Sequence, residues 1–343
     1  MSKLNEEIVP KLASAFGEGE VILTKDRVSN KESKWSKSFK CKDGEDEFGT
    51  IQRIFGIRKS ARGLFEAATS GDGNEKPRIL TLHSSSLLAF LCFNDVANHP
   101  ITIDGIVYDE VMFEVKNDVI DASLGKPSNI DVLLMGENRK KLLFLESKFT
   151  EYLSGGKVFL SPDRYKEFYD LLLYKLDLPF KASFDKVNHK PDKSHSEPFV
   201  TEEYCLINKN NVRTSEYLGG IKQAFSHLLG IATGPAKEQT KGNEDYTSSL
   251  LENADEIKFA SIVFNCNNKK FEKYNKLYKL VFENSEVILE TIKEVLPKSE
   301  IRLTIVPKLL QYQKVFQDNN LSDEVRNFYN KVNDSNISFS NGK

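Results

Sequence analysis

The sequence predicts an α/β fold in which a mixed central β-sheet is flanked by α-helices. Residues 129–135 and 141–148 are rich in apolar residues and are separated by a polar turn, which predicts an antiparallel hairpin. Residues 257–264 and 301–306 predict further buried strands, and the amphipathic stretch 271–296 between them predicts a crossover helix. Strands that alternate with helices in this way favour a layered α/β architecture.

Composition sets outer limits on the fold and the function. The chain has 343 residues, of which 39% are apolar, enough for one large core or two modest ones. A formal net charge of −2 gives no general attraction for nucleic acid, so phosphate contacts would need local basic patches. The four cysteines include no CxxC pair, so neither a zinc ribbon nor a redox motif is indicated. Because we find no signal peptide and no apolar stretch of about 20 residues, we expect a soluble cytoplasmic protein.

We expect one elaborated domain over residues 1–343, with an N-terminal accessory region in 1–80 and a core in 84–310. Within the first eighty residues, only 58–68 is typical of a helix. Ser84 precedes an almost wholly apolar run, so it is predicted to cap the start of a buried helix.

Further elements follow in order along the chain. Residues 101–115 contain two short β-branched segments around Asp-Gly, which predicts extended segments joined by a turn. Residues 163–174 and 216–231 repeat their apolar residues at helical spacing and are predicted to cover the sheet. Residues 186–198 and 233–248 are polar and contain glycine or proline, so we expect loops there.

The hairpin carries the candidate chemistry. Side chains alternate along a strand, so Glu146 and Lys148 share one face, and antiparallel pairing would bring Asp131 within reach of Glu146. Two carboxylates this close repel each other and favour a hard cation such as Mg²⁺, or Mn²⁺ in its place. Lys148 would orient a water or stabilise charge growing on phosphorus. Glu114 is the upstream acid predicted to join Asp131 and Glu146 as a metal ligand.

A chain rich in Glu and Lys contains E-x-K triplets by chance. Residues 32–34 and 256–258 are two others, and each is most simply a solvated charge cluster. Residues 146–148 differ because an apolar strand precedes them and a second apolar strand carries an aspartate. The alternative interpretation is a surface hairpin closed by an ion pair worth about 0–1 kcal/mol.

The sequence Ile130-Asp131-Val-Leu-Leu followed by Phe144-Leu-Glu146-Ser-Lys148 resembles the aspartate and E-x-K signature of PD-(D/E)xK nucleases. The resemblance covers about residues 84–231. It implies a restriction-endonuclease-like core, magnesium at the carboxylates, and phosphodiester hydrolysis in DNA by Asp131, Glu146 and Lys148. Ile130 stands where the proline of the motif would be, which puts the strand entry in doubt rather than the chemistry.

More narrowly, three segments resemble a group of bacterial restriction-endonuclease-like proteins: 84–94, the Phe113-Glu114 pair and 146–152. Many relatives in the superfamily place a polar residue on the helix after the hairpin. Here Gln223 and His227 stand four apart on one helical face, and Gln223 is predicted to reach the site. His227 lies among apolar residues, which favours a hydrogen-bonded core histidine.

Supporting residues are predicted on either side of this core. Thr150, Glu151 and Tyr152 follow the strand and are candidates to hold its geometry, although Glu151 could equally be an exposed charge. Residues 31–42 interleave lysines with Trp35 and Phe39, a mixture suited to DNA contact but more simply read as a solvated loop.

Three functions from different classes remain open. The first is a DNA endonuclease, in restriction or defence, which would act as a homodimer if it cuts both strands. The second is a catalytically inactive nucleic-acid-binding or interaction module on the same scaffold. The third is an inverting glycosidase, which needs two acids about 6.5–9.5 Å apart but no metal and no lysine.

Overall fold

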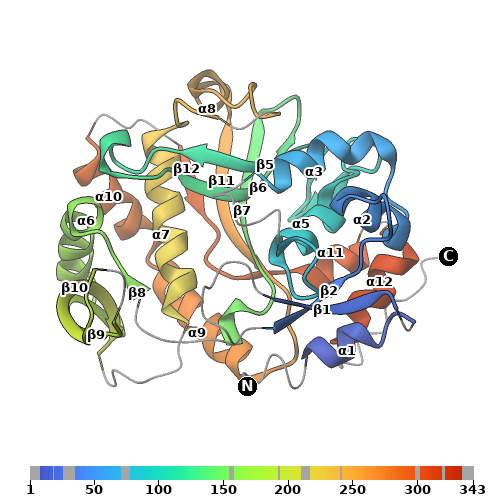
Figure 1. Cartoon of the computed structure of the whole chain (residues 1–343). Helices are drawn as coiled ribbons and strands as arrows, with labels where there is room; N and C mark the ends of the chain where they lie inside the picture. Colours follow the sequence, from blue (N-terminus) through green and yellow to red (C-terminus); the bar gives the residue numbers. More distant parts are fainter. Residues whose placement is uncertain are drawn as a thin grey trace.

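The computed structural model describes residues 8–17, 19–25, 35–70, 78–153, 158–191, 194–209, 217–239, 242–297, 302–318 and 321–333. Within these residues the central sheet has six strands in the order β12-β11-β7-β6-β5, with β13 pairing with β11 (Figure 1). The strands β5, β6 and β7 are antiparallel and β7, β11, β12 and β13 are parallel, so the sheet is mixed, as predicted. Its strands are β5 (Glu110–Asn117), β6 (Ser128–Gly136), β7 (Lys141–Lys148), β11 (Glu256–Val263), β12 (Leu303–Ile305) and β13 (Leu310–Gln311).

Helices cover both faces of this sheet (Figure 1). The first core lies between the sheet and the helices α6 (Pro162–Lys175), α7 (Leu218–Thr233), α9 (Lys269–Phe282) and α10 (Ser285–Val295). The second core lies on the opposite face, with α2 (Glu47–Phe55), α3 (Arg62–Ala68), α5 (Ser85–Phe93), α11 (Tyr312–Asp318) and α12 (Asp323–Asn330).

Strand β7 shows why its sequence is apolar on both faces. Leu142 and Phe144 enter the first core, whereas Leu143 and Leu145 enter the second. All four are buried, and each contributes about 1.5–3 kcal/mol of transfer free energy. A strand covered on both sides reads as a continuous apolar run, so its polar residues must lie at its end.

The N-terminal elements belong to the second core together with the C-terminal helices. They are α1 (Val9–Ala13) and the antiparallel strands β1 (Val21–Lys25) and β2 (Trp35–Phe39). The Phe39 ring lies 5.5 Å from that of Phe55 and 5.6 Å from that of Phe328 in α12. The chain ends that the structure describes therefore meet on one face of the sheet.

The cap and the short hairpin predicted before the central strands are both confirmed. Ser84 Oγ accepts a hydrogen bond from the backbone N–H of Leu87 over 3.1 Å and so caps α5. The strands β3 (Ile101–Ile103) and β4 (Ile106–Tyr108) pair around Asp104 and Gly105, which have φ angles of 49° and 82°. Two consecutive residues with positive φ form the tight turn that Asp-Gly favours.

Two boundary predictions are wrong. The stretch 271–296 is not one helix, because the Asn284 side-chain amide donates to Leu280 O over 3.0 Å and ends α9 before α10 begins. The helix predicted over residues 58–68 instead begins with a 3₁₀ turn (Lys59–Ala61), and α3 starts only at Arg62.

The loop predicted over residues 186–198 is also partly wrong. Strand β9 (Phe180–His189) continues to residue 189 and pairs along its length with β10 (Phe199–Asn208), which is flanked on its other side by β8 (Val158–Phe159). Sequence patterning missed this hairpin because most of β9 is half-buried or exposed and carries little of the apolar signal used to recognise strands.

The edge strand β5 is covered by the segment that was predicted as the loop 233–248. The Gln239 side chain donates to Lys116 O over 2.8 Å, and the Asn243 side chain donates to Phe113 O over 2.8 Å. Side-chain amides thus satisfy backbone groups that a further strand would otherwise pair. None of the described helices is long and apolar enough to cross a membrane.

Candidate active site

Strands β6 and β7 bring Asp131 and Glu146 together, as predicted. Val132 pairs with Leu145. Because the strands are antiparallel, Asp131 before Val132 lies opposite Glu146 after Leu145. Asp131 Oδ2 accepts the backbone N–H of Ser147 over 2.6 Å, which fixes the carboxylate beside the end of β7. Asp131 is partly exposed, whereas Glu146 is buried, so the pair lies at the border of the core.

Glu114, Asp131 and Glu146 form one row of neighbouring residues across β5, β6 and β7. Glu114 lies on the other side of Asp131 from Glu146. Phe113 pairs with Val132 and Val115 with Ile130, which leaves Glu114 opposite Asp131. Glu114 has a φ angle of 52°, a left-handed conformation that costs a non-glycine residue roughly 1–2 kcal/mol. The side-chain alternation of β5 changes here, because Phe113 enters the second core and Val115 the first. The row therefore coincides with a local break in the sheet.

Both oxygens of the Glu146 carboxylate are engaged. Lys148 Nζ donates to Oε1, and His227 Nε2 donates to Oε2 over 2.6 Å. The second ring nitrogen of His227, Nδ1, is hydrogen-bonded to Ser128 Oγ. These four side chains are at most 7% exposed, so the contacts operate in a low-dielectric environment.

Burial and mutual charge set the protonation of the site. Burial and the neighbouring Glu146 raise the pKa of Asp131 well above its usual range, against the opposing effects of Lys148 and the Ser147 N–H. Burial also acts to raise the pKa of Glu146, but Lys148 and His227 outweigh it and hold that pKa well below the usual value. Burial acts to lower the pKa of Lys148, yet Glu146 outweighs it and keeps the pKa raised. Of the two acids, Asp131 is therefore the one that takes up a proton at the higher pH, and Glu146 and Lys148 stay charged as a pair.

Three hydroxyl groups near this centre were not predicted. Ser261 pairs directly with Glu146 across β7 and β11 and is fully buried. The rings of Tyr217 and Tyr274 are 5.1 Å apart, and charge on Lys148 affects the pKa of both. Ser261 is the single polar residue between Phe259 and Val263, and that interruption of an apolar strand was the available signal.

Gly220 allows α7 to approach Tyr274 and leaves room for the ring of Tyr217, the N-cap residue of the same helix. A Cβ atom at Gly220 would lie 2.3 Å from Tyr274 Oη and 2.8 Å from the Tyr217 ring. We expect Gly220→Ala to lower the free energy of unfolding by about 1–3 kcal/mol in urea denaturation, because the buried Tyr274 must move. Gly63→Ala is the matched control, since a Cβ in that helix meets nothing within 4 Å and alanine favours helices by about 0.5–1 kcal/mol. Equal effects of the two changes would contradict the packing argument.

Of the two polar residues considered on α7, only His227 is hydrogen-bonded to the site among the residues that the structure describes. His227 is a buried, hydrogen-bonded histidine, as predicted, but its partner Glu146 was not foreseen. Gln223 lies one turn earlier, is half-buried, and makes no hydrogen bond to the residues that the structure describes. Its participation stays a prediction.

The residues after β7 fold back onto the strand end. Glu151 Oε2 accepts the backbone N–H groups of Phe149 over 2.7 Å and of Thr150 over 2.9 Å. The hydroxyl of the buried Tyr152 donates to Phe264 O over 2.9 Å and so connects this segment to the strand end of β11. These contacts support the geometry of the strand on which Lys148 lies.

The other predicted clusters lie away from this centre. Lys258 pairs with Glu256 over 2.6 Å at a half-buried surface position, as expected of a solvated charge cluster. Phe39 is buried in the second core, so the interpretation that it could stack on bases is wrong. Residues 31–34, which contain the remaining triplet and part of the basic stretch, lie outside the described residues.

The site offers a metal ion two carboxylates, Asp131 and Glu146, and no third His, Cys, Asp or Glu ligand among the described residues. Across the part of the chain that the structure describes, no group of three or more His, Cys, Asp or Glu side chains is arranged to hold a metal ion. Glu114 therefore does not complete a three-carboxylate site in this arrangement. Asp131 and Glu146 meet the needs of Mg²⁺, which takes one or two carboxylates and keeps several waters. The raised pKa of Asp131 indicates that this pair would gain from a further positive charge.

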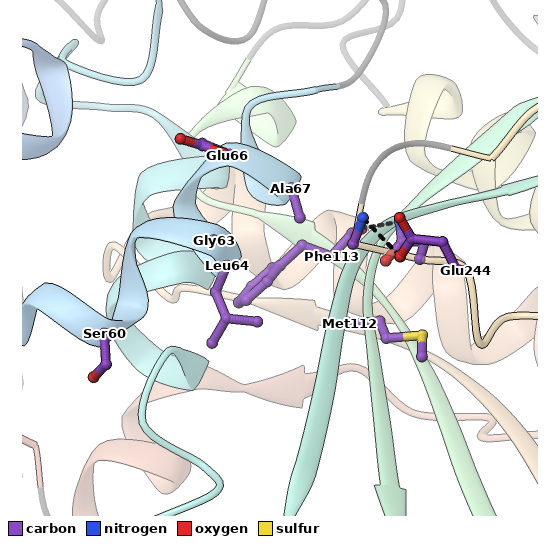
Figure 2. Close-up of a pocket in the computed structure, with 10 residues that line it drawn as sticks. Ser60, Gly63, Leu64, Glu66, Ala67, Met112, Phe113 and Glu244 are labelled. Atoms are coloured by element: carbon purple, nitrogen blue, oxygen red, sulfur yellow. Dashed lines mark hydrogen bonds between the residues drawn. The ribbon is translucent and has the colours of Figure 1, made fainter.

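A cleft of about 470 Å³ lies beside this row rather than over it. Figure 2 shows residues of α3, including Leu64 and Ala67, next to Phe113 of β5, with Glu244 on the other side. Glu244 Oε2 accepts the backbone N–H of Gly242 over 3.0 Å and so shapes one wall. The cleft reaches the residue before Glu114 but is not lined by Asp131, Glu146 or Lys148.

Comparison with known proteins adds no identity. No protein-family model, curated protein or solved structure matches this chain. The resemblance to PD-(D/E)xK nucleases therefore stays a prediction from the motif on β6 and β7.

Proposed function

We propose that this chain is a metal-dependent nuclease that hydrolyses phosphodiester bonds in DNA. The observation that carries the proposal is the convergence of Asp131 and Glu146 from neighbouring strands, with Lys148 bonded to Glu146 on the same strand face. A partly buried acid with a raised pKa beside an ionised one is typical of functional sites. This centre lies at the end of β7, where the apolar run stops.

Each residue has a distinct task in this proposal. Asp131 and Glu146 would hold Mg²⁺, which polarises the scissile phosphate and lowers the pKa of a water. Lys148 is held beside them as an ammonium ion that can donate hydrogen bonds to the attacking water or to a phosphate oxygen. The water gives up one proton to solvent as it bonds to phosphorus, the P–O3′ bond breaks, and the departing 3′ oxygen takes up a proton from solvent.

A second candidate is an inactive nucleic-acid-binding module built on the same scaffold. The observation that favours it is the full engagement of Glu146 by Lys148 and His227, which also suits a purely structural ion cluster. Retained DNA binding without turnover under any metal condition would support this alternative.

Cleavage assays on purified protein test the leading proposal. Supercoiled plasmid and single-stranded DNA would each be incubated with Mg²⁺, with Mn²⁺ and with chelator. We expect nicking or cutting that requires the cation and stops when chelator is added. Cleavage that persists in chelator, or its absence on both substrates with either cation, would contradict a metal-dependent nuclease. Size measurement by light scattering would show whether the active species is a homodimer.

A further inference from the structure

The Glu146 carboxylate has two partners of different kinds, a ring on a helix and a long chain on its own strand. Oε2 is hydrogen-bonded to His227, which lies in the middle of α7, whereas Oε1 is hydrogen-bonded to Lys148, which lies two residues further along β7. A carboxylate only accepts hydrogen bonds, so Nε2 of His227 carries a proton. The other ring nitrogen, Nδ1, is hydrogen-bonded to Ser128 Oγ, and this contact holds the ring in its orientation.

Ser128 connects this contact to the strand that supplies Asp131. It lies on β6 three residues before Asp131 and is 7% exposed. The helix comes close because Gly230 has no side chain: a Cβ there would lie 3.3 Å from Ser128 Cβ and 3.0 Å from Asn117 Cβ. The imidazole orientation is therefore fixed from β6 and α7 together.

We infer that Ser128 and His227 are positioning residues that hold Glu146 Oε2 and leave Oε1 to be shared between Lys148 and a bound divalent cation. The inference rests on the proposed function, because it assumes a cation at Asp131 and Glu146. Lys148 keeps one hydrogen bond when it leaves Oε1, since its ammonium also donates to Ser147 O over 3.2 Å. With a cation bound at Glu146, Lys148 would be free to contact substrate, and without substrate Lys148 would compete with the cation for Oε1.

Titration of the full chain with Mn²⁺, followed by electron paramagnetic resonance without DNA, tests this inference. We expect Lys148→Met to bind Mn²⁺ about tenfold more tightly than the unchanged protein, although it removes a catalytic group. His227→Ala should bind about 10–100-fold more weakly and Ser128→Ala about tenfold more weakly, as is typical when a partner of a metal ligand is lost. His227→Gln should recover much of the affinity, because its amide can donate to Oε2.

Ser226→Ala is the matched control. Ser226 is also 7% exposed, but its hydroxyl is bonded to Tyr165 Oη over 2.7 Å and not to His227, so its loss should leave Mn²⁺ affinity unchanged. Thermal melts of every variant separate lost binding from lost folding. Equal affinities of Ser128→Ala and Ser226→Ala, or no tightening in Lys148→Met, would overturn the inference.

The two proposals can fail separately. A protein that shows this order of Mn²⁺ affinities but cleaves no DNA would refute the proposed function and retain the positioning role. A protein that cleaves DNA with unchanged affinities in the variants would retain the function and refute the positioning role.

Discussion

Glu146→Gln and Lys148→Met are each expected to abolish DNA cleavage, with losses of at least about 10²–10³-fold, and to destabilise the fold. Each change leaves a buried partner without its counter-charge, which typically costs about 3–5 kcal/mol. The double variant Glu146→Gln/Lys148→Met should recover a large part of this stability, because both charges are then removed together. It should nevertheless remain inactive, so loss of catalysis is separated from loss of folding.

Urea denaturation and plasmid cleavage measure the two effects side by side. Glu256→Gln is the matched control, because Glu256 also belongs to an E-x-K triplet and pairs with its lysine, but at a partly exposed position. Its effect should stay within about 0–1 kcal/mol and cleavage should be unchanged. Activity in the double variant, or a double variant no more stable than either single variant, would contradict the assignment of these two residues.

The sequence predicted this pair because its position follows from local rules. Alternation along β7 places Glu146 and Lys148 on one face, and the short turn between β6 and β7 sets the register that brings Asp131 opposite Glu146. Both rules operate over a few residues, so they need no knowledge of the distant chain.

The contact between His227 and Glu146 follows from no such local rule. It depends on how closely α7 packs on the sheet, which is set by Gly230 against Ser128 and by Gly220 against Tyr274. These are contacts between segments far apart in sequence, and a helical pattern predicts only which face is apolar.

The left-handed backbone at Glu114 could not be predicted from the sequence either. Nothing in Val-Met-Phe-Glu-Val signals a positive φ angle, because the sequence pattern is that of an ordinary strand. Local strain of this kind is maintained by the surrounding structure and occurs preferentially at functional sites. The prediction that Glu114 serves as a metal ligand therefore depended on residue type alone.

Asp131→Asn is expected to stabilise the protein in chelator at neutral pH while it abolishes cleavage. The pKa of Asp131 is raised in the folded state, so this carboxyl stabilises the fold fully only below its ordinary pKa of 3.8. Its contribution is lost as pH rises through the raised value, because the ionised form is then partly desolvated beside the charge of Glu146. Asparagine has no such charge and can still accept the Ser147 N–H. The advantage of the variant should therefore grow as pH rises above about 4.

Mg²⁺ should reverse this order. A cation that binds only the folded protein stabilises it by about 2.7 kcal/mol at a concentration 100 times its Kd, so the unchanged protein should gain this amount. Asp131→Asn should gain little, because one of the two carboxylates is absent. Melting temperatures measured between pH 5 and pH 8 check both expectations: the order of stability in chelator and its reversal in Mg²⁺. A variant less stable than the unchanged protein in chelator at pH 7 would show that the Asp131 carboxylate stabilises the fold. The expected reversal of the stability order by Mg²⁺ would instead mean that the repulsion between Asp131 and Glu146 is retained because it favours cation binding.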